Sequence, residues 1–128
     1  MTDKVKYWIE LSDYDLDTAS AMLSTGRYLY VGFMCHQAIE KALKAYFVSS
    51  SSDSAPYSHS LAYLAKKALV FDLLDHRFQE FIDVLEPLNI EARYPSHKER
   101  LMESLTRTRC ENILSGTKEL QQWIKERL

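Results

Sequence analysis

The sequence predicts an all-α protein: a compact up-and-down bundle of about five helices with a four-helix core, in a single domain over residues 1–128. Two observations lead to this fold class. Only three glycines and three prolines interrupt the chain, which favours long helices over the frequent turns of a many-stranded fold. The apolar residues recur at spacings of three and four, the period of a helix with one buried face.

The first helix is predicted from Asp3 to Leu23, where acidic residues separate the apolar ones. Gly26 follows at the position where a helix ends on a residue able to take a positive φ. The second helix is predicted from Tyr28 to Val48. Its apolar stripe should face the core: Cys35, Ala38, Ile39, Ala42, Leu43 and Tyr46. Residues 49–58, SSSSDSAPYS, lack periodicity and predict an exposed, mobile loop.

A shorter third helix is predicted from Ser58 to Val70. His59, near its start, is expected to cap the helix or to pack against it. A fourth helix is predicted from Leu74 to Leu85, and Pro87 should end or kink it, because proline has no amide hydrogen and clashes with the preceding turn.

The last helix is expected to begin at Ser96 and to continue to Arg127. Ser96 has the residue type of an N-cap, and Glu99 follows at the spacing of a capping box. Gly116 interrupts the helix at a cost of about 1 kcal/mol relative to alanine. A kink or a close contact with another helix is therefore expected at Gly116.

Composition and charge exclude several classes of function. A net charge of -2 argues against a generally basic surface for nucleic acid, so such binding needs a local patch. No apolar run approaches the roughly 20 residues of a membrane span, and the charged N-terminus indicates a cytoplasmic protein. Cys35 and Cys110 lack the spacing of zinc ligands and are expected to be buried, reduced thiols. No metal or cofactor is predicted, and the common enzyme motifs are missing.

The polar side of the second helix is a ladder of residues one turn apart. His36 is followed by Glu40, Glu40 by Lys44, and Gln37 by Lys41. We expect this side to face water, where each pair adds about 0.2–0.5 kcal/mol to helix stability. The alternative interpretation is a binding surface.

A second polar cluster precedes the last helix and contains Arg93, Tyr94 and His97. His97 would lie in the first turn of that helix, where the helix dipole favours a neutral imidazole. A neutral histidine could then act as a general base toward a ribose 2′-hydroxyl while Arg93 holds the phosphate. In the alternative interpretation, Arg93 and Tyr94 anchor the loop and His97 is exposed without a chemical role.

Spacings of three and four residues continue from this cluster along the last helix. They place His97, Arg100, Ser104 and Arg107 on one face, which a phosphate backbone could follow. Nearby acidic residues dilute the positive charge. The face therefore equally fits the rim of a dimer interface.

Several motifs, taken in order, resemble those of the HEPN domain family. The longest are FMCHQAIEKALKAYF in the second helix, SHSL at the start of the third, and ARYPS before the last. Shorter matches extend the likeness over nearly the whole chain: Trp8, Asp15-Leu16, Gly26-Arg27-Tyr28, Gln37-Ala38, Glu40 to Ala45, His59-Ser60-Leu61 and Arg93-Tyr94-Pro95.

The resemblance implies a compact helical bundle, commonly a homodimer, often encoded beside a minimal nucleotidyltransferase. In the family such pairs can form toxin and antitoxin, with the HEPN member cutting RNA without a metal. Active members carry an arginine followed after four to six residues by a histidine, and the dimer brings both into one groove. Here only Tyr94, Pro95 and Ser96 separate Arg93 from His97, one residue fewer. Arg-Tyr-Pro matches a branch for which nucleotide or partner binding is the common proposal.

Three functional hypotheses follow. In the first, the protein is a dimeric nucleotide- or RNA-binding component, paired with a nucleotidyltransferase in a system of the toxin-antitoxin type. Its ligand would contact Arg93, Tyr94, His97, Arg100, Arg107, Lys41 and Lys44. In the second, it is a metal-independent ribonuclease toxin with Arg93 and His97 as the catalytic pair. In the third, it is a structural dimerisation module only.

Overall fold

The protein is described here by a computed structural model that covers residues 1–91 and 94–128, with side chains except those of residues 90, 91, 95 and 97. The described residues form six α-helices and one 3-10 turn, and they contain no strand. The elements are α1 (Asp3–Ser24), α2 (Tyr28–Ser50), α3 (Leu61–Lys67), η1 (Phe71–Leu73), α4 (His76–Glu91), α5 (Pro95–Ser104) and α6 (Arg107–Lys125). The all-α prediction is confirmed, with one more helix than expected.

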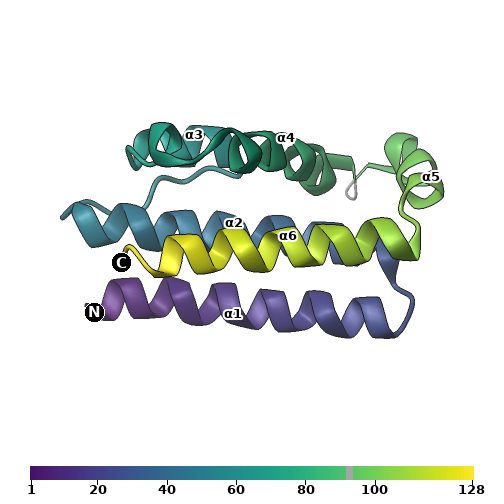
Figure 1. Ribbon diagram of the computed structural model, residues 1–128, viewed down its shortest axis with the longest axis horizontal. Helices are drawn as coiled ribbons and strands as arrows, with labels where there is room; N and C mark the ends of the chain where they lie inside the picture. Colours follow the sequence, from purple (N-terminus) through teal and green to yellow (C-terminus); the bar gives the residue numbers. More distant parts are fainter. Residues whose placement is uncertain (92–93) are drawn as a thin grey trace.

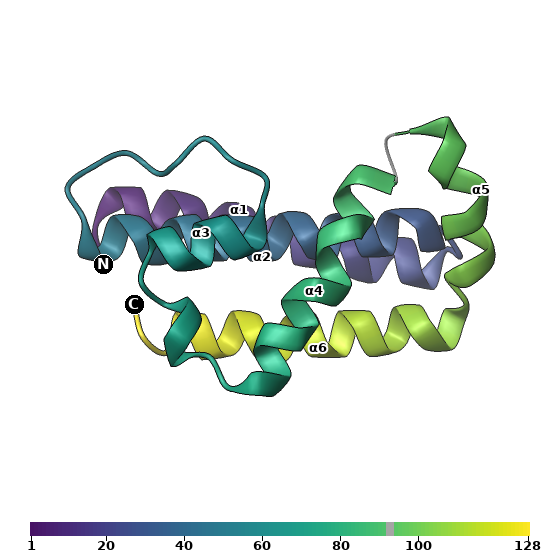
Figure 2. The ribbon, with the colours of Figure 1, turned by 90° about the horizontal axis from the view of Figure 1, so that it is seen from above.

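The four longest helices, α1, α2, α4 and α6, form an up-and-down bundle. α1, α2 and α6 lie side by side, and α3 and α4 cover them from one side (Figure 1). Seen from above, α4 crosses over α2 and α6 at an angle, and α5 lies at one end of the bundle (Figure 2). α2 is the central element, because it packs against α1, α3, α4, α5 and α6. Both chain termini lie at the end opposite α5 (Figure 1).

The core forms around the apolar stripe of α2, as the sequence predicts. Cys35, Ala38, Ile39, Ala42 and Leu43 are fully buried, and Tyr46 packs half-buried at the edge. None of the described helices combines the length and the apolar character that a membrane crossing requires.

Glycine allows close packing or an unusual backbone at two predicted positions. Gly26 follows the end of α1 with a φ of +75°, as expected for a helix stop. A Cβ at Gly116 would lie 2.7 Å from the ring of Phe81, so the Phe81 side chain of α4 packs directly against α6 there. The expected contact at Gly116 is therefore confirmed.

The prediction that Pro87 ends the helix is wrong, because α4 continues through it to Glu91. Pro87 has no amide hydrogen to donate to the previous turn, which ordinarily destabilises a helix by about 3 kcal/mol. The neighbouring Leu85 and Leu88 are buried in the core. Their packing holds the helix together across the missing hydrogen bond.

The expected last helix is two helices. Tyr94, and not Ser96, is the N-cap of α5, because Pro95 has the fixed φ that suits a first helical position and starts the helix two residues earlier. The chain leaves helical geometry at the buried Leu105. Thr106 then accepts a hydrogen bond from the Arg109 amide at 3.2 Å and caps a new helix.

The third helix is shorter than the predicted range of Ser58 to Val70, since α3 begins at Leu61 and ends at Lys67. Leu69 takes a φ of +62°, and the amide of Val70 turns back to the carbonyl of Ala65 at 2.9 Å. These contacts form a Schellman motif with leucine at the position usually held by glycine.

Candidate functional site

The polar side of α2 is buried, so the prediction that it faces water is wrong. His36 is 0%, Glu40 3% and Lys44 7% exposed. Residue spacing shows which side chains share a face, but it does not show whether another part of the fold covers that face. Here α2 finds hydrogen-bond and ion-pair partners on α1, on α4 and in the segment before α3.

Glu40 joins α2 to the segment before α3. Its Oε1 lies 2.9 Å from Nδ1 of His59, and its Oε2 accepts a hydrogen bond from Nζ of Lys44 at 3.3 Å. The Lys44 ammonium also lies 5.3 Å from the centre of the Trp8 ring, on α1. His59 therefore does not cap α3; Ser60 does, by accepting a hydrogen bond from the Tyr63 amide.

Glu86 of α4 holds the start of α3 in a similar way. It accepts hydrogen bonds from the Leu61 amide at 2.6 Å and from the Ser60 hydroxyl at 3.2 Å. His36 Nε2 lies 3.7 Å from the same carboxylate, and within the described part of the chain neither ring nitrogen has a hydrogen-bond partner. Burial opposes ionisation of Glu86, but His36, the Leu61 amide and the Ser60 hydroxyl outweigh it and lower the pKa of the carboxyl.

The remaining polar residues of α2 also bind neighbouring helices. Lys41 pairs with Asp15 of α1, and Gln37 Nε2 donates to Oδ1 of the buried Asn89 of α4 at 3.1 Å. Lys41 therefore forms an ion pair with a carboxylate, as Lys44 does. Asn89 and Glu86 could not be predicted as partners from the sequence, because no local pattern shows which residues of α4 will lie opposite α2.

The second predicted cluster lies at the α5 end of the bundle. Arg93 lies outside the described residues. His97 is in the first turn of α5, as predicted, but its side chain lies outside the described part. Tyr94 is 55% exposed at the N-cap of α5, which starts without a side-chain cap.

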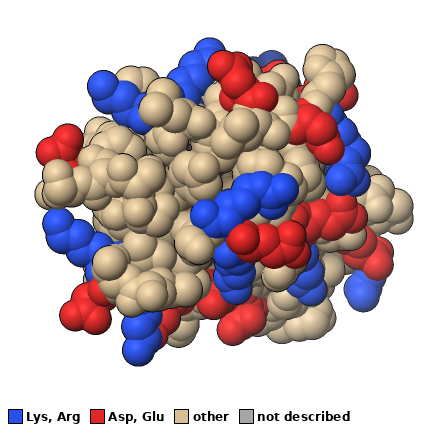
Figure 3. All heavy atoms as spheres, turned by 60° about the vertical axis from the view of Figure 1, so that its left-hand side comes forward, with Lys and Arg blue, Asp and Glu red and all other residues tan. Residues whose placement is uncertain are grey.

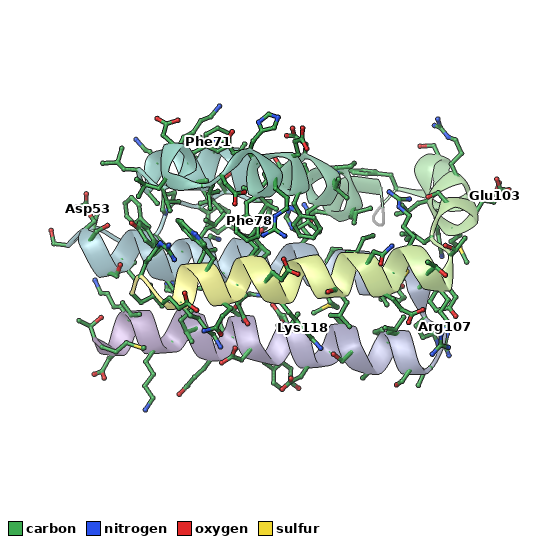
Figure 4. The ribbon with its side chains drawn as sticks, viewed as in Figure 1. Asp53, Phe71, Phe78, Glu103, Arg107 and Lys118 are labelled. Carbon is green, nitrogen blue, oxygen red and sulfur yellow. The ribbon has the colours of Figure 1, made fainter. Side chains whose placement is uncertain are left out.

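The expected stripe along one helix is wrong beyond Ser104, because the helix is interrupted between α5 and α6. Arg100 is exposed on α5, and Arg107 is the first residue of α6, where its Nε lies 3.7 Å from Oε1 of Glu111. Ser104 accepts a hydrogen bond from the Arg109 guanidinium at 2.8 Å. Arg107 and Glu103 still lie at the same end of the molecule (Figure 4).

Neither cysteine has the environment of a reactive thiol. Cys35 and Cys110 are free and buried, and burial raises the pKa of Cys35 to about 12. Over residues 1–91 and 94–128, no three His, Cys, Asp or Glu side chains gather as a metal ion would need.

Charge on the described surface is mixed. On the side of the chain termini, lysine and arginine are interspersed with aspartate and glutamate over a largely uncharged surface (Figure 3). A continuous basic face of the kind that binds nucleic acid through charge alone is not present on this side.

Comparison with known proteins gives two matches. The model of the HEPN domain family matches residues 5–128. The crystal structure of TT1696 from Thermus thermophilus superposes with a TM-score of 0.81 at 23% identity, covering 99% of this chain and 100% of that chain. At this identity the likeness shows the fold. A search of curated proteins gave no match.

Proposed function

Since this chain belongs to the HEPN domain family, we propose that it is a nucleotide- or RNA-binding component whose ligand lies along α5 and the start of α6. Membership of the family supports a nucleotide- or RNA-related role in general. The residues proposed to contact the ligand are Arg93, Tyr94, His97, Arg100 and Arg107.

The distribution of exposure supports this proposal. Tyr94, Arg100 and Arg107 are exposed on α5 and at the start of α6, where an aromatic ring and guanidinium groups suit bases and phosphates. Lys41 and Lys44 are less exposed, with 20% and 9% of their side-chain surface accessible, and they pair with Asp15 and Glu40. We therefore assign these two lysines to the support of the fold rather than to direct contact with a ligand.

We further propose that the protein works as a homodimer in the cytoplasm. Two copies would bring two α5 segments into one groove, as the family resemblance suggests. A minimal nucleotidyltransferase, in a system of the toxin-antitoxin type, is the proposed partner. Light scattering tests the dimer, which should have about twice the monomer mass of 14.9 kDa. A monomer at high concentration would contradict a groove shared between subunits.

Titration of a labelled single-stranded RNA tests the binding function. Arg93→Ala and Arg100→Ala should each weaken binding. Each should also lower the salt dependence of the binding constant by the amount expected for about one lost phosphate contact. Lys98→Ala is the matched control, because Lys98 is an exposed cation of α5 outside the proposed set. Equal affinity of all three variants and the wild type would contradict the proposal.

The same RNA tests the alternative function, a metal-independent ribonuclease. His97 lies in the first turn of α5, close after Arg93 in the sequence, and this placement supports the alternative function. Cleavage by the wild type in the presence of a chelator, lost in His97→Ala, would establish the nuclease and replace the binding-only function. Binding without cleavage across varied RNAs would support the binding component.

A further inference from the structure

A hollow of about 550 Å³ opens between the end of α1 and the start of α2. It lies at the end of the bundle that also carries α5 (Figure 1). Its lining comes from both helices: Thr18, Met22, Thr25, Arg27, Tyr30, Phe33 and Met34. None of the residues that line this hollow belongs to the set predicted for catalysis or phosphate binding.

The walls of the hollow suit a flat aromatic ring. Tyr30 is 47% exposed although it is a large aromatic residue, and Phe33 is half-buried beside it. Met22 and Met34 add thioethers, which are polarisable and adapt to the edge of an aromatic ring. Nucleobases stack on such side chains with little dependence on sequence.

The rim of the hollow suits an anion. Among the described residues no acidic side chain lines the hollow, and no carboxylate lies within ion-pair distance of the Arg27 guanidinium. Arg27 is also the N-cap residue of α2 and provides no side-chain cap. The guanidinium and the positive end of α2 therefore favour a phosphate at the same place.

A contact between helices places this hollow near the proposed binding end. Cys110 Sγ lies 3.7 Å from the carbonyl oxygen of Tyr28, so the start of α6 lies beside the start of α2. Arg107 begins α6 one turn before Cys110. A single-stranded RNA that runs along α5 and past Arg107 would therefore approach the hollow.

We propose that this α1–α2 hollow holds a nucleobase that carries a phosphate, with Tyr30 and Phe33 stacking on the base and Arg27 holding the phosphate. The base can belong to a free nucleotide or to single-stranded RNA that continues over α5 and α6. This inference rests on the proposed function and adds a base-recognition site to it.

The four methionines allow a direct test by NMR of their labelled methyl groups. Met22 and Met34 line the hollow, Met102 is 55% exposed on α5, and Met1 lies near the opposite end. Titration with a short oligoadenylate should shift the signals of Met22 and Met34 and leave Met1 unchanged. A shift of Met102 alone would overturn the hollow as a site but leave the proposed function standing. No shift at any methionine would overturn both.

Separate titrations distinguish the source of the base. Shifts of Met22 and Met34 with AMP would show that a free nucleotide is sufficient, whereas shifts with oligoadenylate alone would identify the hollow as part of an RNA site. Both results support the inference. Equal shifts with inorganic phosphate alone would overturn it, because the base would then contribute nothing.

Substitution of Tyr30 supplies a second readout. Tyr30→Ala should weaken binding of labelled oligoadenylate by about tenfold, the scale of one lost stacking contact, while Tyr30→Phe retains it. Tyr63→Ala is the matched control, since Tyr63 is also 47% exposed but lies on α3. Unchanged affinity of a folded Tyr30→Ala variant would contradict the stacking role. Should this variant fail to fold, the methionine titration of the wild type still decides the question.

Discussion

Glu40 and His59 are 19 residues apart in the sequence, and Oε1 of the first lies 2.9 Å from Nδ1 of the second. This contact joins two of the motifs by which the chain resembles its family, one on α2 and one at the start of α3. Glu40 is 3% exposed, and its other oxygen binds Lys44. The motif residues on the polar side of α2 therefore hold helices together.

Glu40→Ala should lower the free energy of unfolding by about 3–5 kcal/mol, because the buried Lys44 would lose its counter-charge. Urea unfolding monitored by circular dichroism measures the change. Glu10→Ala is the control: Glu10 pairs with Lys6 at 3.9 Å on an exposed surface, and its loss should change stability by about 0–1 kcal/mol. Similar effects of the two substitutions would contradict a structural role for the Glu40 pair.

Glu86→Gln should make the protein less sensitive to acid. The folded state lowers the pKa of Glu86 below its ordinary value of 4.5. This carboxylate therefore stabilises the fold above pH 4.5, and the stabilisation is lost as the pH falls through the lowered folded pKa. Loss of charged hydrogen bonds should also lower stability at pH 7 by about 1–3 kcal/mol. Urea unfolding at several pH values tests both effects; parallel pH curves for variant and wild type would contradict the account.

Gly116→Ala should destabilise the protein by about 1–3 kcal/mol, although alanine favours helices. The added Cβ would lie 2.7 Å from Cε1 of Phe81. Combining it with Phe81→Leu should recover part of the loss, because the ring that causes the clash is gone. A double-mutant cycle by thermal unfolding measures this coupling, and simple additivity of the two substitutions would argue against the close contact.

Leu69→Gly should stabilise the protein by about 0.5–1 kcal/mol, since a left-handed backbone costs a leucine about 1–2 kcal/mol and glycine much less. Leu69 is 83% exposed, so little packing is lost. Leu73→Gly is the control: Leu73 is also exposed, but its φ is not positive, and glycine there should destabilise. A lower unfolding midpoint for Leu69→Gly would show that packing outweighs the backbone strain.

The helix limits and the core of the first half could be predicted from the sequence. The period of α2 identifies its buried apolar stripe, and Gly26 marks the end of α1, because both signals are local. Burial of His36, Glu40 and Lys44 could not be predicted, because it depends on Glu86 and His59, which only the folded chain brings near. The break before Thr106 was missed for a different reason: a threonine cap inside a long helical pattern is a weak signal beside the apolar period.

The candidate site was predicted in part. The sequence correctly predicts that Arg100 and Arg107 lie on helices, but it assigns them to one continuous helix, which the structure divides into α5 and α6. Lys41 and Lys44 looked available because a charged side chain on an amphipathic helix usually faces water. Their carboxylate partners on α1 and α2 remove that availability.

Binding of labelled single-stranded RNA to the Arg100→Ala/Arg107→Ala double variant, measured over a range of salt concentrations, tests the proposed phosphate site at the α5 end of the bundle. The α5 end of the bundle is proposed to bind phosphates, and the polar side of α2 to support the fold. We expect at least a tenfold loss of affinity in a variant that still unfolds cooperatively. The salt dependence of binding should fall by the amount expected for about two lost phosphate contacts. Wild-type affinity with the wild-type salt dependence would contradict the proposed site.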